Sequence, residues 1–120
     1  MICETKNAII TDAILSTADH GVLSAWVHLN YGGSGQGFGG YVLCQHPTSP
    51  HYPGAGNYGG VFIRRVMDVV GVEKWSDLKG KACRVIASHS GVTQIGNIIK
   101  DEWFDPQKEF LLLEGGEAAV

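Results

Sequence analysis

The stretch Gly32-Gly33-Ser34-Gly35-Gln36-Gly37-Phe38-Gly39-Gly40-Tyr41 decides how this chain folds. Six of its first nine residues are glycine. Because glycine has no Cβ, the backbone here can take positive φ angles and approach another backbone or a ligand closely. Strand-like sequence lies on both sides of the stretch, so we expect its central residues 34–36 to form the tip between two antiparallel strands.

The residues before the glycines predict a β-hairpin. Residues 8–16 are rich in β-branched side chains, and Asp19-His20-Gly21 supplies the turn into residues 22–31. Alternation in the second strand places one set of side chains toward the core and Trp26 with His28 on the other face. Trp26 and His28 could line a groove or an interface. The alternative is an ordinary solvated strand face with one partly buried tryptophan.

After the glycines, residues 38–44 resume the strand pattern and residues 45–57 read as an ordered loop or mobile flap. An amphipathic helix follows, with Asn57 as the expected N-cap and Gly71 as the expected left-handed residue after its end. Its apolar stripe is expected to pack on the sheet. The opposite face is marked by Arg64, Arg65 and Asp68.

The rest of the chain predicts a short helical turn over residues 72–80 and a second hairpin made of residues 81–87 and 92–99. We expect residues 100–106 to dock across the sheet until Pro106 ends the segment. The predicted fold is therefore α+β, an antiparallel sheet in the order β-β-β-α-β-β with one main helix on one face. Residues 1–106 are expected to form a single domain, and residues 107–120 a tail that is docked or disordered.

Composition narrows the class of protein. The net charge is −3 with 18% charged residues, which argues against a protein that grips nucleic acid directly. The three cysteines, Cys3, Cys44 and Cys83, match no disulfide or zinc framework, and residues 1–6 lack a signal-peptide core. No apolar run reaches the roughly 18 residues of a membrane span. We therefore expect a cytoplasmic protein without a membrane anchor.

One candidate site is an anion site at the start of the helix. Asn57, Tyr58, Gly59 and Gly60 would present free N–H groups there, with Arg64 or Arg65 supplying positive charge. Gly35, Gln36 and Gly37 could add backbone donors, and Trp26 could stack on a base. The glycines match no nucleotide fingerprint, so the alternative is that a tight bend, a bulge or close strand packing requires them.

Two further types of site are weighed against simpler explanations. Cys44, His46 and His51, with His28 as a further candidate, carry zinc-ligand atoms, but their spacing is not diagnostic, and loop histidines are usually solvated. His89 and Ser90 could form a nucleophile pair with an aspartate, but turn composition accounts for them fully. We therefore predict no cofactor, no metal site and no enzymatic activity, with a small enzyme or metal-binding domain as the alternative.

Three strings in the chain resemble a family of small, uncharacterised phage and prophage proteins. They are Gly-Gln-Gly-Phe-Gly-Gly-Tyr at 35–41, Phe-Ile-Arg-Arg-Val-Met-Asp-Val-Val-Gly-Val-Glu-Lys-Trp-Ser-Asp-Leu-Lys-Gly-Lys at 62–81 and Ile-Gly-Asn-Ile-Ile-Lys-Asp-Glu-Trp-Phe-Asp-Pro at 95–106. The resemblance covers about residues 7–106 and brings no established active site. It implies a protein that counters bacterial defence.

Two modes of action fit that context. The chain could sequester an anionic nucleotide signal, or it could bind a host defence protein directly in the manner of an anti-CRISPR protein, through exposed aromatic residues such as Trp26, Trp103 and Phe104. We also expect a homo-oligomer, because the sheet leaves open edges and residues 111–113 form an apolar burst near the chain's end.

Overall fold

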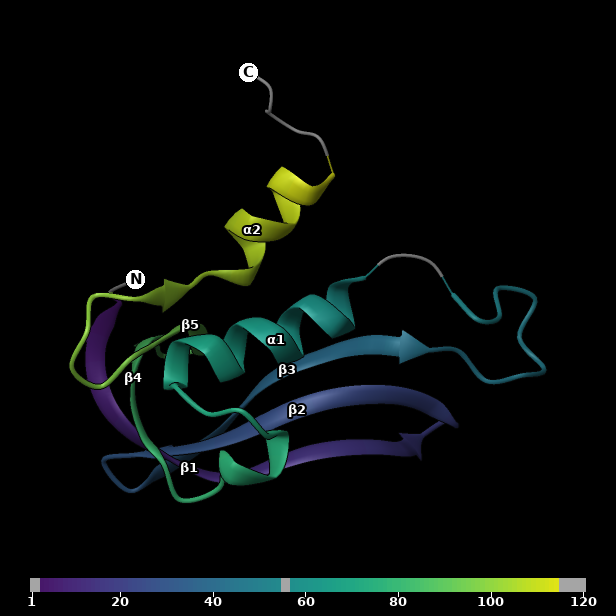
Figure 1. Ribbon diagram of the computed structural model, residues 1–120. Helices are drawn as coiled ribbons and strands as arrows, with labels where there is room; N and C mark the ends of the chain where they lie inside the picture. Colours follow the sequence, from purple (N-terminus) through teal and green to yellow (C-terminus); the bar gives the residue numbers. More distant parts are fainter. Residues whose placement is uncertain (1–2, 55–56, 115–120) are drawn as a thin grey trace.

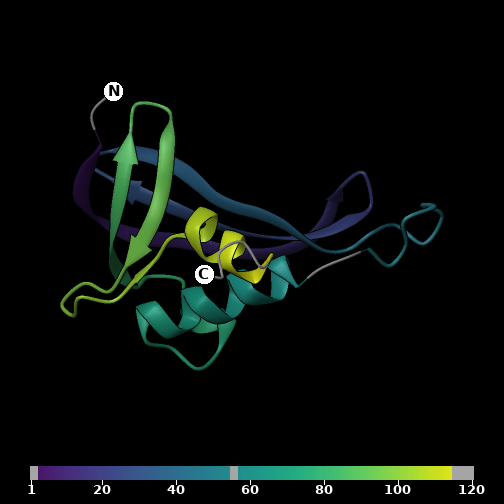
Figure 2. The same ribbon diagram turned by 90° about the horizontal axis from the view of Figure 1, so that it is seen from above.

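A computed structural model describes residues 3–54 and 57–114 (Figure 1). Six antiparallel strands form one curled sheet in the order β3-β2-β1-β4-β5-β6, and the two helices pack on one side of it (Figures 1 and 2). The elements are β1 (Glu4–Asp19), β2 (Val22–Tyr31), β3 (Ser34–Cys44), α1 (Tyr58–Val70), a 3₁₀ turn (Trp75–Asp77), β4 (Ala82–Ser88), β5 (Gly91–Gly96), β6 (Trp103–Phe104) and α2 (Pro106–Leu113). The predicted α+β fold, with its main helix on one face, is confirmed.

The length of β1 explains why the sheet curls. Its first residues, Glu4 to Ile9, pair with β4, whereas Ile9 to Asp19 pair with β2. The register with β2 breaks between Ile10 and Asp12, and a β-bulge of this kind bends a strand. Figure 2 shows the β4–β5 hairpin crossing the ends of the longer strands.

The turn between β2 and β3 consists of Gly32 and Gly33, with φ angles of 64° and 83°. Two consecutive residues with positive φ make the tight hairpin turn whose twist suits the flanking strands. Residues 34–36 therefore do not form the tip. They are the first residues of β3, and Gly35 and Gln36 pair with Asn30 and Leu29. The expectation of a glycine loop there was wrong because the two glycines complete the turn.

Helix α1 follows its sequence pattern closely. Its buried side chains include Phe62, Val66 and Val69, and Gly71 ends it with a φ of 96° and an N–H bond to the Met67 carbonyl. Asn57 occupies the N-cap position, but its side chain accepts no capping hydrogen bond.

The core lies between the sheet and the two helices. Phe62 packs against Phe38, with ring centroids 5.4 Å apart, and against Phe104, with centroids 6.1 Å apart. Leu78, Ile95 and Val85 are fully buried around these rings. The 3₁₀ turn closes one end of this core, where Trp75 meets Phe62.

The C-terminal part differs from its prediction. Trp103 and Phe104 add β6 to the sheet edge, and Pro106 opens α2 where we expected it to end a segment. Proline suits the first helical position because its missing N–H would be unpaired there, and the Asp105 carboxylate accepts the Lys108 N–H as the N-cap. Residues 115–120 of the predicted tail lie outside the described residues.

Aromatic contacts dock α2 on the body. Phe110 stacks on Tyr58 at 4.5 Å between centroids and meets Tyr41 edge-on at 4.9 Å. Leu111, Leu112 and Leu113 remain more than half exposed. No helix in the described part of the chain is long and apolar enough to cross a membrane.

Candidate functional site on the outer sheet face

The side of β1, β2 and β3 that faces away from α1 is here called the outer face. Cross-strand pairing defines it, because directly opposed residues point to the same side: Ile14 lies opposite Trp26, and Asp12 lies opposite His28. Trp26 is 39% exposed and Val42 is 38% exposed. The described part of the chain therefore covers these two side chains only partly.

The Trp26 indole lies over the backbone of β3 between two glycines. A Cβ at Gly37 would lie 3.2 Å from the ring carbon Cε3, and a Cβ at Gly40 would lie 2.6 Å from Cζ2. Real Cβ atoms do not approach a ring as closely as the second distance. These two glycines therefore have a packing role, which is to let a large aromatic ring rest on the strand.

A third glycine of the same strand has the matching role on the inner side. A Cβ at Gly39 would lie 2.6 Å from Cζ of Phe62 and 2.8 Å from the Ala25 carbonyl oxygen, and its φ of 122° is in the region that favours glycine. The glycine pattern of β3 thus accommodates one aromatic ring on each face of the sheet.

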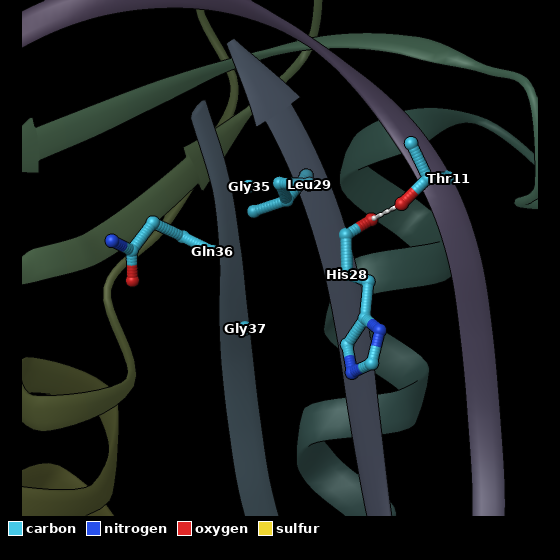
Figure 3. A pocket seen from close by; sticks show the side chains of 6 residues that line it. All are labelled: Thr11, His28, Leu29, Gly35, Gln36 and Gly37. Carbon is cyan, nitrogen blue, oxygen red and sulfur yellow. Dashed lines mark hydrogen bonds between the residues drawn. The ribbon is translucent and has the colours of Figure 1, made fainter. Parts of the chain in front are cut away.

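Two surface hollows meet beside Trp26. The first, called the His28 hollow, has a volume of about 310 Å³ and is lined by Thr11, His28, Leu29, Gly35, Gln36 and Gly37 (Figure 3). The second, called the Trp26 hollow, has a volume of about 280 Å³ and lies between β3, β5 and the start of α2. Gly37 lines both hollows, so they are neighbours on β3.

Charge is scarce on the outer face. Asp12 is the acidic residue at its centre, and one of its carboxylate oxygens accepts the Ala13 N–H. Half of the other acidic residues of the described chain follow β5: Asp101, Glu102, Asp105, Glu109 and Glu114. The site is therefore an aromatic and polar but nearly uncharged surface.

The structure brings together only part of the predicted anion site. Trp26, Gly35, Gln36 and Gly37 lie close together near the start of β3. The helix start lies at the other end, because a Cβ at Gly59 would meet the Leu43 side chain at 2.7 Å. Six strand residues lie between Gln36 and Leu43, and at about 3.3 Å per residue these two residues are roughly 20 Å apart.

The other residues at the helix start have different roles. The Tyr58 hydroxyl donates to the Glu114 carboxylate, and its ring stacks on Phe110. Asn57 and Gly60 are exposed.

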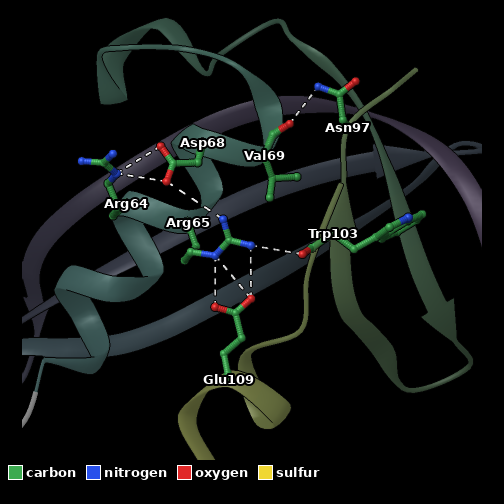
Figure 4. Close-up of polar contacts among 7 residues, drawn as sticks. All are labelled: Arg64, Arg65, Asp68, Val69, Asn97, Trp103 and Glu109. Atoms are coloured by element: carbon green, nitrogen blue, oxygen red, sulfur yellow. Dashed lines mark hydrogen bonds and ion pairs between the residues drawn. The ribbon is translucent and has the colours of Figure 1, made fainter. Parts of the chain in front are cut away.

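The two arginines are engaged in ion pairs (Figure 4). Arg65 points toward α2, where its Nε lies 3.0 Å from Glu109 Oε1 and its Nη2 donates to the Trp103 carbonyl oxygen at 3.2 Å. Its guanidinium also lies 5.7 Å from the centre of the Phe104 ring. Arg64 is on the exposed side of α1 and pairs with Asp68. The expectation that both arginines mark the outer side of the helix was therefore wrong for Arg65.

The residues weighed for metal binding or catalysis make local contacts. Cys44 Sγ donates to the Gln45 carbonyl, and the His46 ring bonds the Thr48 hydroxyl. Among residues 3–54 and 57–114, no three His, Cys, Asp or Glu side chains lie together as metal ligands. Burial raises the pKa of Cys83 to about 12, so this thiol stays protonated at neutral pH and is a poor nucleophile.

Comparison of the chain with protein-family models, curated proteins and solved structures finds no match.

Sequence reasoning found Trp26, His28 and the glycines but missed the far wall of the Trp26 hollow. Val92, Thr93, Pro106 and Gln107 form that wall. Their approach to β3 depends on the curl of the whole sheet, and no local pattern in the sequence reports that curl.

Proposed function

We propose that the chain is a non-enzymatic binding protein that recognises a protein partner through its outer face. The observation that supports this most strongly is Trp26, which rests on Gly37 and Gly40 and is still 39% exposed. Interface cores are depleted in charge and enriched in aromatic residues, and tryptophan is a frequent energetic hot spot. A tryptophan held in place by glycines also loses little freedom on binding.

The resemblance to small phage and prophage proteins favours a bacterial defence protein as the partner, and host cytoplasm as the place of action. The neutral outer face would form the contact, while the net charge of −3 would favour a basic partner by long-range attraction. An anionic nucleotide-like ligand stays a prediction from the sequence, because the glycine segment and the arginines are not assembled into one site.

Self-association also stays part of the proposal. Leu111, Leu112 and Leu113 are more than half exposed on α2. Exposed apolar side chains favour oligomers. Light scattering at working concentrations should show a dimer or larger species, and a monomer alone would contradict this.

The test compares two single variants of exposed aromatic residues. The protein is used to capture partners from a lysate of its bacterial host, and the affinity of the captured protein is then measured for wild type, Trp26→Ala and Tyr52→Ala. Tyr52 is the matched control, since it is 50% exposed but lies in the loop after β3. Losing a hot-spot tryptophan costs about 2 kcal/mol or more, which is roughly 30-fold in Kd. Equal affinities for wild type and Trp26→Ala would reject the proposal.

A further inference from the structure

Two strands of the sheet present unpaired edges to the same hollow. Among the described residues, β3 ends the sheet order and pairs only with β2, so its other edge is open. Within the same part of the chain, β5 pairs with β6 only at Ile95 and Gly96, and no strand lies beside the edge of residues 91–94. Backbone N–H and C=O groups on open edges are ready to pair with another extended chain.

The short length of β6 leaves this opening. Its next residues would continue along β5 into the space beside Val92 and Thr93, but Pro106 has no N–H to donate and begins α2 instead. Pro106 and Gln107 then line the end of the Trp26 hollow. The hollow therefore lies where a longer β6 would have continued the sheet toward β3.

The walls of the hollow suit an extended, uncharged segment. β3 and β5 come close at one end, where a Cβ at Gly91 would lie 3.8 Å from Gln36 Oε1, and the hollow runs from there along residues 37–41 of β3. Its volume is about 280 Å³. No Asp, Glu, Lys, Arg or His lines it, so a charged segment would find no partner there.

We infer that the partner contributes an extended, uncharged segment that enters the Trp26 hollow and adds to the open edge of β3 as a new strand. The inference rests on the proposed function, because the hollow shares Trp26 and Gly37 with the outer face. Main-chain hydrogen bonds to β3 would supply affinity, and contact with Trp26 would select the side chain that lies over it.

The first test uses displayed random twelve-residue peptides as the probe and the unchanged protein. Selection should enrich peptides with an uncharged stretch of β-branched residues. Alternate N–H groups of an added strand point toward β3, so N-methylation of every second residue should weaken binding by about tenfold or more, while methylation of the residues between should have little effect. The absence of binding peptides, or a methylation pattern without this period of two, would overturn the inference.

The second test fills the hollow. Thr93 lines it and is exposed, so Thr93→Trp should block entry and weaken peptide binding at least tenfold, which is about 1.4 kcal/mol. Thr17→Trp is the matched control, an exposed threonine in β1 that does not line the hollow. If Trp26→Ala abolishes capture of the partner but Thr93→Trp does not, strand addition is overturned. The proposed function would then still stand. Capture that survives both substitutions would reject the proposed function itself.

Discussion

At the scale of single residues, the neighbouring glycines Gly59 and Gly60 of α1 differ in how much space surrounds them. A Cβ at Gly59 would lie 2.7 Å from Leu43 Cγ and 2.8 Å from the Val42 carbonyl oxygen, whereas a Cβ at Gly60 would meet nothing within 4 Å. Gly59 is therefore required for the close approach of α1 to β3, and Gly60 is not.

Alanine substitution should separate these two glycines. Gly59→Ala should lower the free energy of unfolding by about 1 to 3 kcal/mol, because the added methyl group overpacks the helix–sheet contact. Gly60→Ala should raise it by about 0.5 to 1 kcal/mol, because alanine favours the helix. Urea denaturation of the two variants measures both effects. Equal shifts in the same direction would contradict this packing.

Cys83 predicts a loss of stability in alkaline solution. Burial raises its pKa from 9.0 to about 12, so above pH 9 the unfolded chain releases a proton that the folded protein keeps. The protonated Cys83 thiol therefore makes its full contribution to the free energy of unfolding below about pH 9. This contribution falls as the pH rises toward 12. Between pH 8 and pH 10, under reducing conditions, wild type should lose about 1 kcal/mol more than Cys83→Ala.

Tyr41 and Tyr58 do not complicate this comparison. Burial, then Asp105, raises the pKa of Tyr41, and the hydrogen bond to Glu114 raises the pKa of Tyr58. Both tyrosines are present in both proteins, so their effect on stability cancels in the difference. A pH dependence that is the same in wild type and Cys83→Ala would show that this thiol is not the cause.

At the scale of elements, Arg65 links α1 to α2 and β6. It contacts the Glu109 carboxylate, the Trp103 carbonyl and the Phe104 ring, and its side chain is 32% exposed. Arg64, one residue earlier, is 78% exposed and pairs only within its own helix, with Asp68.

Truncating each arginine should therefore give different results. Arg65→Ala should lower the free energy of unfolding by about 1 to 3 kcal/mol and increase amide exchange in α2, since hydrogen bonds to charged groups are lost. Arg64→Ala should change it by no more than about 0.5 kcal/mol, as is usual for exposed pairs. Similar losses for both variants, or unchanged exchange in α2, would contradict the role of Arg65.

Some elements could be predicted from local patterns and others could not. The strand alternation around Trp26 and the apolar stripe ending at Gly71 were sufficient to predict β2 and α1 within a few residues. Helix α2 was missed because Pro106 was interpreted only as a helix breaker. Asp105 before Pro106 is also an N-cap followed by a favoured first helical residue, and this signal could have indicated α2.

At the scale of the whole molecule, some features of the candidate site could be predicted from the sequence and others could not. Trp26 and His28 could be assigned to one face because side chains alternate along a strand. The roughly 20 Å between the glycines and the helix start could not be seen in the sequence, because it depends on which end of β3 the helix packs against. The ion pair between Arg65 and Glu109 also joins residues that are 44 positions apart.

The central claim is that the outer face around Trp26 is the recognition surface. The most direct measurement is amide hydrogen exchange of the full chain, alone and with its captured partner. We expect slower exchange in residues 24–42 of β2 and β3 when the partner is bound, with little change in the loop around Tyr52. Protection confined to the acidic segment of residues 100–114, with no change in β2 and β3, would contradict it.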